Sequence, residues 1–305
     1  MAHRRRGRDV SGVVVLDKPR GMSSNDAVQS VKRRFDARKV GHTGSLDPLA
    51  TGVLPLCLGD ATKFSQYLLT SDKRYVASLR LGVATDSGDA DGRVIEERDP
   101  GNIARADVEA ALDDFRGDIE QVPSMFSAVK HQGQPLYKLA RQGIEIERQA
   151  RPVTVYSNEI VDFAEGTLTI DVHCSKGTYV RTIAHDLGEA LGCGAHVYAL
   201  RRTIAGPYGE DDLVSFDDMD AAAEEGRLDG LLRPVATTVG QWPTVELTGA
   251  PAFYLKQGQP VLVPHAPTEG WVRLYEQEET QGRFIGVGEI LEDGRVAPRR
   301  LIARS

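Results

Sequence analysis

One carboxylate in this chain lies in a glycine-rich segment whose backbone can approach a neighbouring group closely. Residues 41–52 read Gly-His-Thr-Gly-Ser-Leu-Asp-Pro-Leu-Ala-Thr-Gly and contain a single acidic residue, Asp47. The glycines permit positive φ or close backbone contact, and Pro48 restricts Asp47 to extended geometry. The pattern predicts that the Asp47 carboxylate is aimed at a target. Asp-Pro also starts ordinary turns, so the loop alone does not identify a reaction.

Three other segments occur with this loop in a characteristic order. They are residues 16–24 (LDKPRGMSS), 72–75 (DKRY) and 175–181 (SKGTYVR), and the loop itself continues as Val-Leu-Pro. Together the segments resemble the bacterial tRNA pseudouridine synthase B (TruB) family, and the resemblance extends over residues 12–300. It implies a cofactor-independent isomerase that converts uridine 55 in the T-loop of tRNA to pseudouridine.

That reaction breaks the bond between uracil N1 and ribose C1′ and rejoins the base through C5. It needs an ionised carboxylate, either as a nucleophile at C1′ or as a base that removes the 2′ proton, and both routes stay open. We assign this role to Asp47. Enclosure would raise the pKa of its carboxyl, and a bidentate pair with Arg181 is expected to oppose the rise. The resemblance implies that Tyr75 stacks on the uracil and is a candidate for moving the C5 proton.

Further residues are expected around this centre. Asp89 is expected to complete the ion-pair network, with Asp86 and Asp91 as competitors in the same turn. The resemblance implies that His42 stacks within the opened T-loop and that Leu200 lines the uracil pocket, although both residue types are also typical of structural positions. The other candidates for contacts with RNA or for active-site support are Lys18, Lys63, Tyr179 and Lys130. Seven scattered histidines form no HExxH or comparable ligand pattern, so we expect no metal site. The resemblance implies that the enzyme uses no cofactor.

Composition indicates an ordinary globular protein. The chain has 305 residues, is 41% hydrophobic and contains no apolar run approaching the roughly 18 residues of a membrane span. Its basic N-terminus is not followed by an apolar stretch, so we expect a cytoplasmic protein without a signal peptide. Three cysteines without a CxxC pair are expected to be reduced core thiols.

The net charge of −7 does not exclude an RNA enzyme, because it is concentrated in one segment. Residues 210–229 carry nine acidic residues and one arginine, a local charge of −8, so the rest of the chain sums to +1. We expect the acidic segment to form a solvated helix face. By contrast, residues 123–152 combine five Lys and Arg residues with two acidic residues, and Met125, Phe126 and Tyr137 are interleaved with them. This segment resembles the RNA-contacting insertion of the family.

The pattern predicts an α+β protein of two folded units. Residues 1–9 form a basic tail, 10–243 the catalytic domain and 244–305 a small β-rich unit that resembles a PUA domain. Strands are predicted over 10–16, 53–58, 75–81, 153–163, 167–174 and 196–203 in the first unit, and over 260–264, 271–275, 284–288 and 295–302 in the second. Helices are predicted after a cap at Ser24 or Asn25, over 61–69 and 105–115, and from Val180, while 240–247 is predicted to be a linker. The resemblance implies that the catalytic sheet is curved and mostly antiparallel.

Two other functions fit parts of the sequence. A tRNA-folding chaperone would use the same binding surface with catalysis incidental. A uracil-releasing glycosidase would use the same carboxylate but liberate the base. The complete set of motifs favours the synthase, which we expect to act on tRNA as a monomer without an obligate protein partner or guide RNA.

Overall fold

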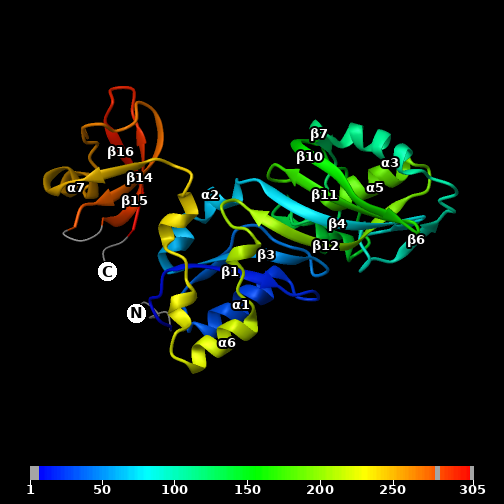
Figure 1. Ribbon diagram of the computed structural model, residues 1–305, viewed down its shortest axis with the longest axis horizontal. Coiled ribbons are helices and arrows are strands. Elements are labelled where there is room, and N and C mark those ends of the chain that lie inside the picture. The colour runs from blue at the N-terminus through cyan, green and yellow to red at the C-terminus, as the bar shows by residue number, and fades with distance from the viewer. Residues whose placement is uncertain (1–6, 279–281, 303–305) are drawn as a thin grey trace.

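The computed structural model describes residues 7–278 and 282–302, and most of the predicted tail lies outside this range. A long unit of strands and helices is joined at one end to a small C-terminal unit (Figure 1). No helix in the described part of the chain is both long enough and apolar enough to cross a membrane.

An eight-stranded sheet forms the large unit, in the order β1-β3-β12-β4-β11-β10-β7 with β2 beside β3. The strands are β1 (Gly12–Lys18), β2 (Val40–His42), β3 (Thr51–Leu58), β4 (Lys73–Leu81), β7 (Gly117–Gln121), β10 (Arg151–Ala164), β11 (Thr167–Cys174) and β12 (Ala195–Ala205). Every neighbouring pair is antiparallel except β3 and β12, which run parallel. The predicted mostly antiparallel sheet is confirmed.

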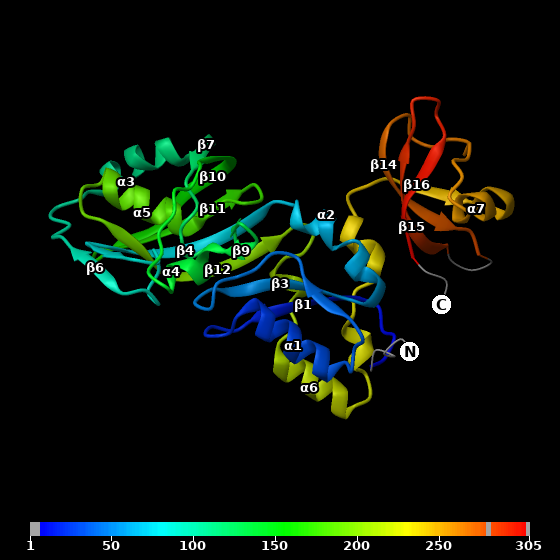
Figure 2. The ribbon, with the colours of Figure 1, turned by 180° about the vertical axis from the view of Figure 1, so that it is seen from behind.

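Helices cover the sheet at both ends. Helices α1 (Ser24–Arg34) and α6 (Phe216–Glu224) lie side by side near β1, whereas α3 (Arg105–Leu112) and α5 (Val180–Ala190) lie near β10 and β11 (Figures 1 and 2). Helix α1 buries Ala27, Val28 and Val31 at helical spacing in the main core. Strand β1 reads as a continuous apolar run because its two faces join two different buried clusters.

The start of α1 differs from the prediction of Ser24 or Asn25 as its cap. Ser23 is the N-cap, and its hydroxyl accepts a hydrogen bond from the backbone N–H of Asp26 at 3.2 Å. Ser24 is already helical, and its hydroxyl is bonded to a distant loop residue, Leu46. A side chain engaged in tertiary contacts cannot also cap the helix.

The predicted helix over 61–69 is divided in two. The 3₁₀ helix η1 (Gly59–Lys63) ends before α2 (Ser65–Leu69) begins. The hydroxyls of Thr62 and Ser65 donate to the carbonyls three residues earlier, at 2.7 and 3.0 Å, and so favour the tighter turn. The helix predicted over 105–115 similarly ends as α3 and continues as the 3₁₀ helix η2 (Asp113–Phe115).

Several short elements of the large unit lie outside the eight-stranded sheet. A hairpin of β5 (Val83–Thr85) and β6 (Val94–Glu97) encloses the turn that carries Asp89. The basic insertion contains a second hairpin, β8 (Lys130–His131) and β9 (Gln134–Pro135), and the helix α4 (Leu136–Ala140). The segment after β12 adds the 3₁₀ helices η3 (Glu210–Asp212), η4 (Leu228–Leu231) and η5 (Val235–Val239).

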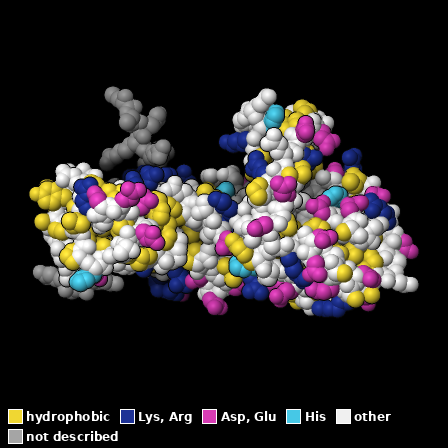
Figure 3. All heavy atoms as spheres, turned by 90° about the horizontal axis from the view of Figure 1, so that it is seen from above, with side chains coloured by type: hydrophobic (Ala, Val, Ile, Leu, Met, Phe, Trp, Pro, Cys, Tyr) yellow, Lys and Arg dark blue, Asp and Glu magenta, His cyan; other side chains and the backbone are white. Residues whose placement is uncertain are grey.

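The acidic segment is surface helix, as predicted. The acidic side chains of α6 are exposed, and Asp220 pairs with Arg34 at 2.7 Å. Asp212, which precedes α6, pairs with Arg233 at 2.7 Å. Figure 3 shows cationic and anionic side chains interspersed over the face in view, without a large area of one sign.

The C-terminal unit is a four-stranded sheet in the order β13-β14-β15-β16. It contains β13 (Thr244–Leu247), α7 (Gly249–Lys256), β14 (Gly270–Glu276), β15 (Arg283–Ile290) and β16 (Val296–Leu301). The predicted linker 240–247 is wrong at its end, because β13 pairs in parallel with β14. The predicted strand 260–264 is also wrong: its flanking prolines lack N–H donors, and only Val261 makes an isolated bridge, to Val296. Helix α7 was not predicted.

An aromatic cluster joins the two units. Phe64 and Val239 of the large unit and Val287 of the small one are fully buried in one cluster. Trp242 and Trp271 stack beside it with ring centroids 5.2 Å apart. The C-terminal unit is therefore anchored by apolar packing around the 3₁₀ helices η1 and η5, which lie next to β3 and β1.

Candidate active site

The loop that carries the candidate catalytic residue Asp47 connects β2 to β3, and residues 43–52 are named the catalytic loop after this candidate role. Its two positive-φ residues are glycines, with φ of 126° at Gly44 and 93° at Gly52. Gly52 pairs with Arg202 of β12, and a Cβ added at Gly52 would lie 2.3 Å from the Arg202 carbonyl oxygen. Only glycine permits this approach of the loop to the sheet.

This close approach makes Gly52→Ala a test of the loop. The substitution should lower the free energy of unfolding by at least about 2 kcal/mol, because it combines a backbone clash with an unfavourable φ. Urea denaturation measures the change. Gly41→Ala is the matched control, since a Cβ there meets nothing within 4 Å. Equal stability of the two variants would contradict the described approach of β3 to β12.

Residues 18–24 brace the catalytic loop on both sides of Asp47. The Ser24 hydroxyl accepts a hydrogen bond from the Leu46 N–H at 2.7 Å and donates to the Leu46 carbonyl at 3.0 Å. The Pro48 carbonyl accepts from the Gly21 N–H at 2.7 Å and from Lys18 Nζ at 3.4 Å. The residues immediately before and after Asp47 are thus tied to one neighbouring segment.

Arg181 pairs with Asp47 from the first turn of α5. Its Nε lies 2.9 Å from Asp47 Oδ2, and its Nη1 lies 3.5 Å from Asp89 Oδ2. Nη1 also donates to the Ser87 carbonyl and Nη2 to the Phe126 carbonyl, both at 2.9 Å. The expected bidentate pair is therefore not what the structure shows. The guanidinium instead distributes its donors over four acceptors and joins the catalytic loop to two other segments.

Asp89 is the acid of its turn that reaches Arg181. Its other carboxylate oxygen accepts hydrogen bonds from the Ser87 hydroxyl at 2.6 Å and from the Asp91 N–H at 3.2 Å. Asp86 instead accepts from the Arg93 N–H at 2.9 Å. The side chain of Asp89 is buried, so its charge acts on Arg181 with little screening by water.

Opposing influences set the ionisation of Asp47. Burial raises the pKa of its carboxyl, the charges of Arg181 and Lys18 lower it, and the charge of Asp89 raises it. The side chain nevertheless stays 39% exposed, so solvent still supports its ionised form. Lys18 is itself fully buried, and burial lowers the pKa of its ammonium to about 8. The carboxylate therefore faces solvent at its open edge and cations behind it.

Tyr75 lies on β4, opposite Arg202 of β12 and Val172 of β11. Burial raises the pKa of its phenol, and nearby Arg202 opposes the rise. Its hydroxyl is consequently protonated at neutral pH. The ring belongs to the partly buried layer packed on the main core, which agrees with a position between the core and a bound base.

His42 and Leu200 occupy the two sides of the catalytic loop. The Nδ1 atom of His42 accepts a hydrogen bond from the Gly44 N–H at 3.4 Å, and burial with the charge of Arg202 lowers the pKa of the imidazole. Leu200 is 8% exposed on β12, and its carbonyl accepts from the Thr51 hydroxyl at 3.5 Å. Both candidates therefore contact residues of the catalytic loop.

The remaining candidates, Tyr179, Lys130 and Lys63, lie on three different elements of the fold. Tyr179 caps α5, and its backbone exchanges hydrogen bonds with the Gln121 side chain at 2.9 and 3.3 Å. Lys130 is exposed on β8 of the insertion. Lys63 pairs with Asp60 within η1 at 2.7 Å and makes no contact with the Asp47 network. Lys63 and Lys130 are thus the two candidates that no contact among the described residues joins to Asp47 or Arg181.

Sequence reasoning missed Ser24 and Arg202. Ser24 belongs to a segment that carried the resemblance, but its contact with the loop depends on how α1 packs. Arg202 lies two residues after Leu200 on one strand, so a period of two places both side chains on the same face. This alternation along the strand is the sequence signal that could have identified Arg202 as a neighbour of the site. Among the described residues, the site included, no cluster of three or more His, Cys, Asp and Glu side chains could hold a metal ion.

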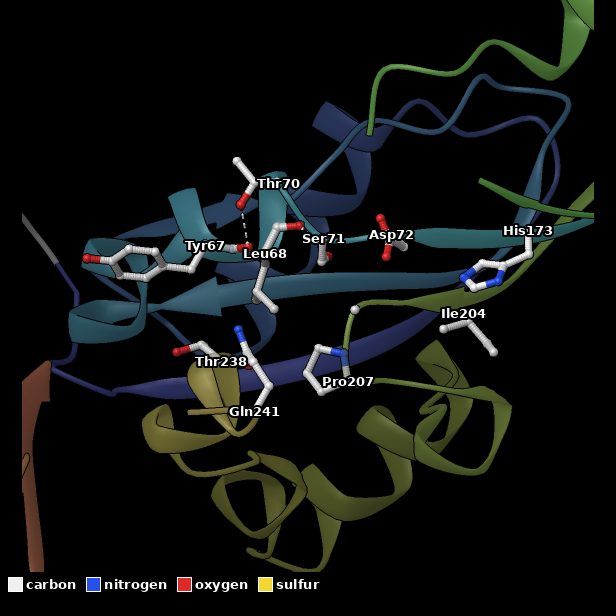
Figure 4. A pocket seen from close by; sticks show the side chains of 11 residues that line it. Tyr67, Leu68, Thr70, Ser71, Asp72, His173, Ile204, Pro207, Thr238 and Gln241 are labelled. Carbon is white, nitrogen blue, oxygen red and sulfur yellow. Dashed lines mark hydrogen bonds between the residues drawn. The ribbon is translucent and has the colours of Figure 1, made fainter. Parts of the chain in front are cut away.

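A separate cavity of about 430 Å³ lies where β4 begins and β12 ends (Figure 4). Asp72 and His173 line it from the sheet, and Thr238 and Gln241 from the segment that leads to the C-terminal unit. Asp72 accepts a hydrogen bond from the Tyr156 hydroxyl at 3.2 Å. None of the residues paired with Asp47 lines this cavity.

Models of known families match nearly the whole chain. The TruB family pseudouridylate synthase N-terminal domain matches residues 32–180, and the tRNA pseudouridylate synthase B C-terminal domain matches residues 181–240. A third model, the C-terminal domain of pseudouridine synthase II TruB, matches residues 243–302.

Individual proteins agree with these matches. The chain is 54% identical to tRNA pseudouridine synthase B of Serratia proteamaculans, over 98% of this chain and 97% of that protein. It is 55% identical to the protein of the same name from Yersinia enterocolitica, over 98% and 93%. A chain in the crystal structure of a Cbf5-Nop10-Gar1 complex superposes with a TM-score of 0.72 at 26% identity, over 96% of this chain and 84% of that one.

Fold, site and relatives together define a pseudouridine synthase, an isomerase that acts on uridine in RNA. The similarity at this level and coverage is far above what a shared fold alone produces. The chain belongs to the TruB family of tRNA pseudouridine synthases.

Proposed function

We propose that this enzyme converts uridine 55 in the T-loop of tRNA to pseudouridine, with Asp47 as its catalytic residue. The observation that carries the proposal is the half-open Asp47 carboxylate, braced at Leu46 and Pro48 and paired with buried Arg181. A group that must meet a ribose carbon needs an open edge and a fixed position, and Asp47 has both. The relatives at 54% and 55% identity are named for tRNA, which supports the choice of substrate.

The target nucleotide has to leave the folded T-loop before its ribose can meet Asp47. Extrusion costs a few kcal/mol of unstacking, and RNA contacts made by the enzyme offset that cost. Asp47 then either attacks C1′ or removes the 2′ proton, and the detached uracil turns and rejoins through C5. We assign to Leu200 and Tyr75 the walls that hold the uracil during the turn, and to His42 a stacking position in the opened loop.

The state of Tyr75 bears on the last proton transfer. Because burial raises the pKa of its phenol, the resting side chain is a hydrogen-bond donor and not a base. It can take part in removing the C5 proton only by passing its own proton onward as it receives the new one. A relay of this kind needs a second acceptor within reach once RNA is bound.

We assign tRNA binding outside the loop to the insertion and to the C-terminal unit. Lys130, Lys138, Arg141 and Arg151 of the insertion are exposed, and Arg141 lies over the ring of Tyr137 at 5.6 Å. Exposed cations beside aromatic rings suit phosphates and unstacked bases. The Phe126 carbonyl that binds Arg181 connects this insertion to the catalytic centre.

The domain boundaries follow from the same proposal. We take residues 10–243 as the catalytic domain and 244–305 as a PUA-like RNA-binding domain, whose described strands begin with β13. The aromatic cluster that contains Trp242 and Trp271 would then hold two RNA-binding surfaces at a fixed separation. We propose that the enzyme acts in the cytoplasm as a monomer, without a guide RNA.

Incubation with an unmodified elongator tRNA transcript tests the position. We expect one pseudouridine, at position 55, when the product is mapped by chemical modification and primer extension. A transcript with cytidine at position 55 is the control and should gain none. Pseudouridine at another uridine would contradict the assignment. Release of free uracil, measured by mass balance, would instead indicate a glycosidase.

A further inference from the structure

Arg202 is a buried cation to which the proposed function assigns no role. Its side chain belongs to β12 and the residue is 1% exposed. Within residues 7–278 and 282–302, no carboxylate lies within the 4.0 Å ion-pair distance of its guanidinium. Neighbouring Arg201, by contrast, is partly exposed and pairs with Asp17 at 3.0 Å and with Glu210 at 2.6 Å. An unpaired buried charge is costly, so its carbonyl partners have to compensate.

Those carbonyl partners lie near the two ends of the catalytic loop, at Gly44 and, one residue beyond the loop, at Val53. Nε of Arg202 donates to the Val53 carbonyl at 2.7 Å, and Nη2 donates to the Gly44 carbonyl at 3.2 Å. Asp47 lies between these two residues in the sequence. The guanidinium is planar and rigid, so one group bonded to both carbonyls fixes the separation of the ends of the loop.

The strand register places the same residue beside Tyr75. Arg202 faces Tyr75 across the β4–β12 pair and Gly52 across the β3–β12 pair. It therefore lies between the tyrosine and the end of the catalytic loop within one sheet. Its charge also acts on Tyr75, where it opposes the rise in the pKa of the phenol that burial causes.

We propose that Arg202 is a positioning residue for the isomerisation: it ties the two ends of the catalytic loop together and holds Tyr75 in register with Asp47. It does not touch the reacting atoms. Its effect passes through Gly44 and Val53 to the Asp47 carboxylate, so the inference rests on the role proposed for Asp47. If the Asp47→Asn variant kept normal activity, that role would fail whatever Arg202 does, and the two failures are distinguishable.

Two variants test the proposal. Arg202→Lys keeps the charge but cannot donate in a rigid fork to both carbonyls, and Arg202→Gln keeps a donor without charge. We expect the single-turnover rate at saturating enzyme to fall about 10-fold to 100-fold in both, the cost of a displacement on the order of 1 Å at a reacting group. Affinity for the tRNA transcript should stay within about twofold of wild type, because no RNA contact is assigned to Arg202.

Controls separate positioning from general damage to the fold. Arg201→Lys, on the same strand, should keep the wild-type rate. Amide hydrogen exchange in residues 44–52 should quicken in both Arg202 variants, while β4 and β11 keep their protection. In Arg202→Gln, ¹³C-tyrosine NMR should show a higher pKa for Tyr75, because the cation that favours the phenolate is gone.

The proposal is overturned if either folded variant turns over tRNA at the wild-type rate, or if its rate loss only reflects a loss of tRNA affinity. Amide hydrogen exchange of the wild-type enzyme can also overturn the proposal. If residues 44–52 exchange as fast as an unstructured peptide, Arg202 does not hold the ends of the loop together. This last measurement does not depend on the folding of any variant.

Discussion

Replacing Asp47 by Asn should abolish pseudouridine formation while tRNA binding and the fold are kept. Asn has the same shape but no negative charge, and it can neither attack C1′ as a carboxylate nor remove a proton. The expected loss is at least about 10⁴-fold in single-turnover rate, the scale seen when an essential nucleophile or base is removed. Arg181 would keep its contacts with Asp89, Ser87 and Phe126, so the network survives the loss of one member.

Asp91→Asn is the matched control, because this exposed acid lies in the turn of Asp89. Its rate should equal that of wild type. Filter binding with the unmodified transcript should give Asp47→Asn an affinity within a few-fold of wild type. Turnover by Asp47→Asn at a rate near that of the control would remove Asp47 from the mechanism.

The same variant separates catalysis from tRNA folding. If Asp47→Asn refolds a misfolded transcript as well as wild type does, the binding surface has a chaperone activity that does not need the carboxylate. If refolding is lost together with isomerisation, the chaperone alternative has no support. The proposed isomerisation and the chaperone alternative would both open the T-loop, and they would differ only in whether the glycosidic bond is then broken.

A strand with one buried face was predictable because its apolar residues alternate along the sequence. Strand β11 runs from Thr167 to Cys174, as the sequence predicts, since its apolar residues alternate cleanly. Helix α7 gave no such signal. Its sequence, Gly-Ala-Pro-Ala-Phe-Tyr-Leu-Lys, has Gly249 and Pro251 in the first turn and exposes Phe253 and Tyr254. Tertiary packing of Ala252 and Leu255 decides its structure, and sequence periodicity cannot show that.

The residues of the candidate site likewise fall into two groups, those that the sequence indicates and those that only the fold brings together. Asp47, Arg181 and Asp89 belong to motifs or turns with recognisable chemistry. In the structure the Arg181 guanidinium lies 2.9 Å from the Asp47 carboxylate and 3.5 Å from the Asp89 carboxylate. The residues that support them come from tertiary structure. Ser24 reaches Leu46 only because α1 packs beside the loop, so its role depends on the fold and not on neighbouring residues in the sequence.

Removal of the Arg181 charge should both slow the reaction and move its pH dependence. Arg181 favours the ionised form of Asp47, whereas burial and Asp89 oppose it. In Arg181→Gln the pKa of Asp47 should therefore rise further, so a larger fraction of the enzyme is protonated and inactive at a given acidic pH. The acid limb of the single-turnover rate should shift to higher pH, and raising the pH should restore part of the lost rate.

The part that pH does not restore measures positioning. Arg181 also donates to the Ser87 and Phe126 carbonyls, which Gln cannot reach together, so we expect a residual loss of about 10²-fold to 10³-fold on the alkaline plateau. Arg181→Lys keeps the charge, so its acid limb should stay closer to that of wild type while its plateau falls. Arg98→Gln, which removes an arginine paired with Glu189, should change neither.

The position of the acid limb and the rate on the alkaline plateau together show whether Arg181 acts mainly through its charge or mainly by positioning Asp47. A shifted limb with an intact plateau would mean that Arg181 acts through charge alone, and its contacts with the turn of Asp89 and with the insertion would be structural. A lowered plateau with an unmoved limb would mean that solvent at the open edge of Asp47 already maintains its ionisation, consistent with its 39% exposure. If neither quantity changed, the ion pair between Arg181 and Asp47 would have no part in catalysis.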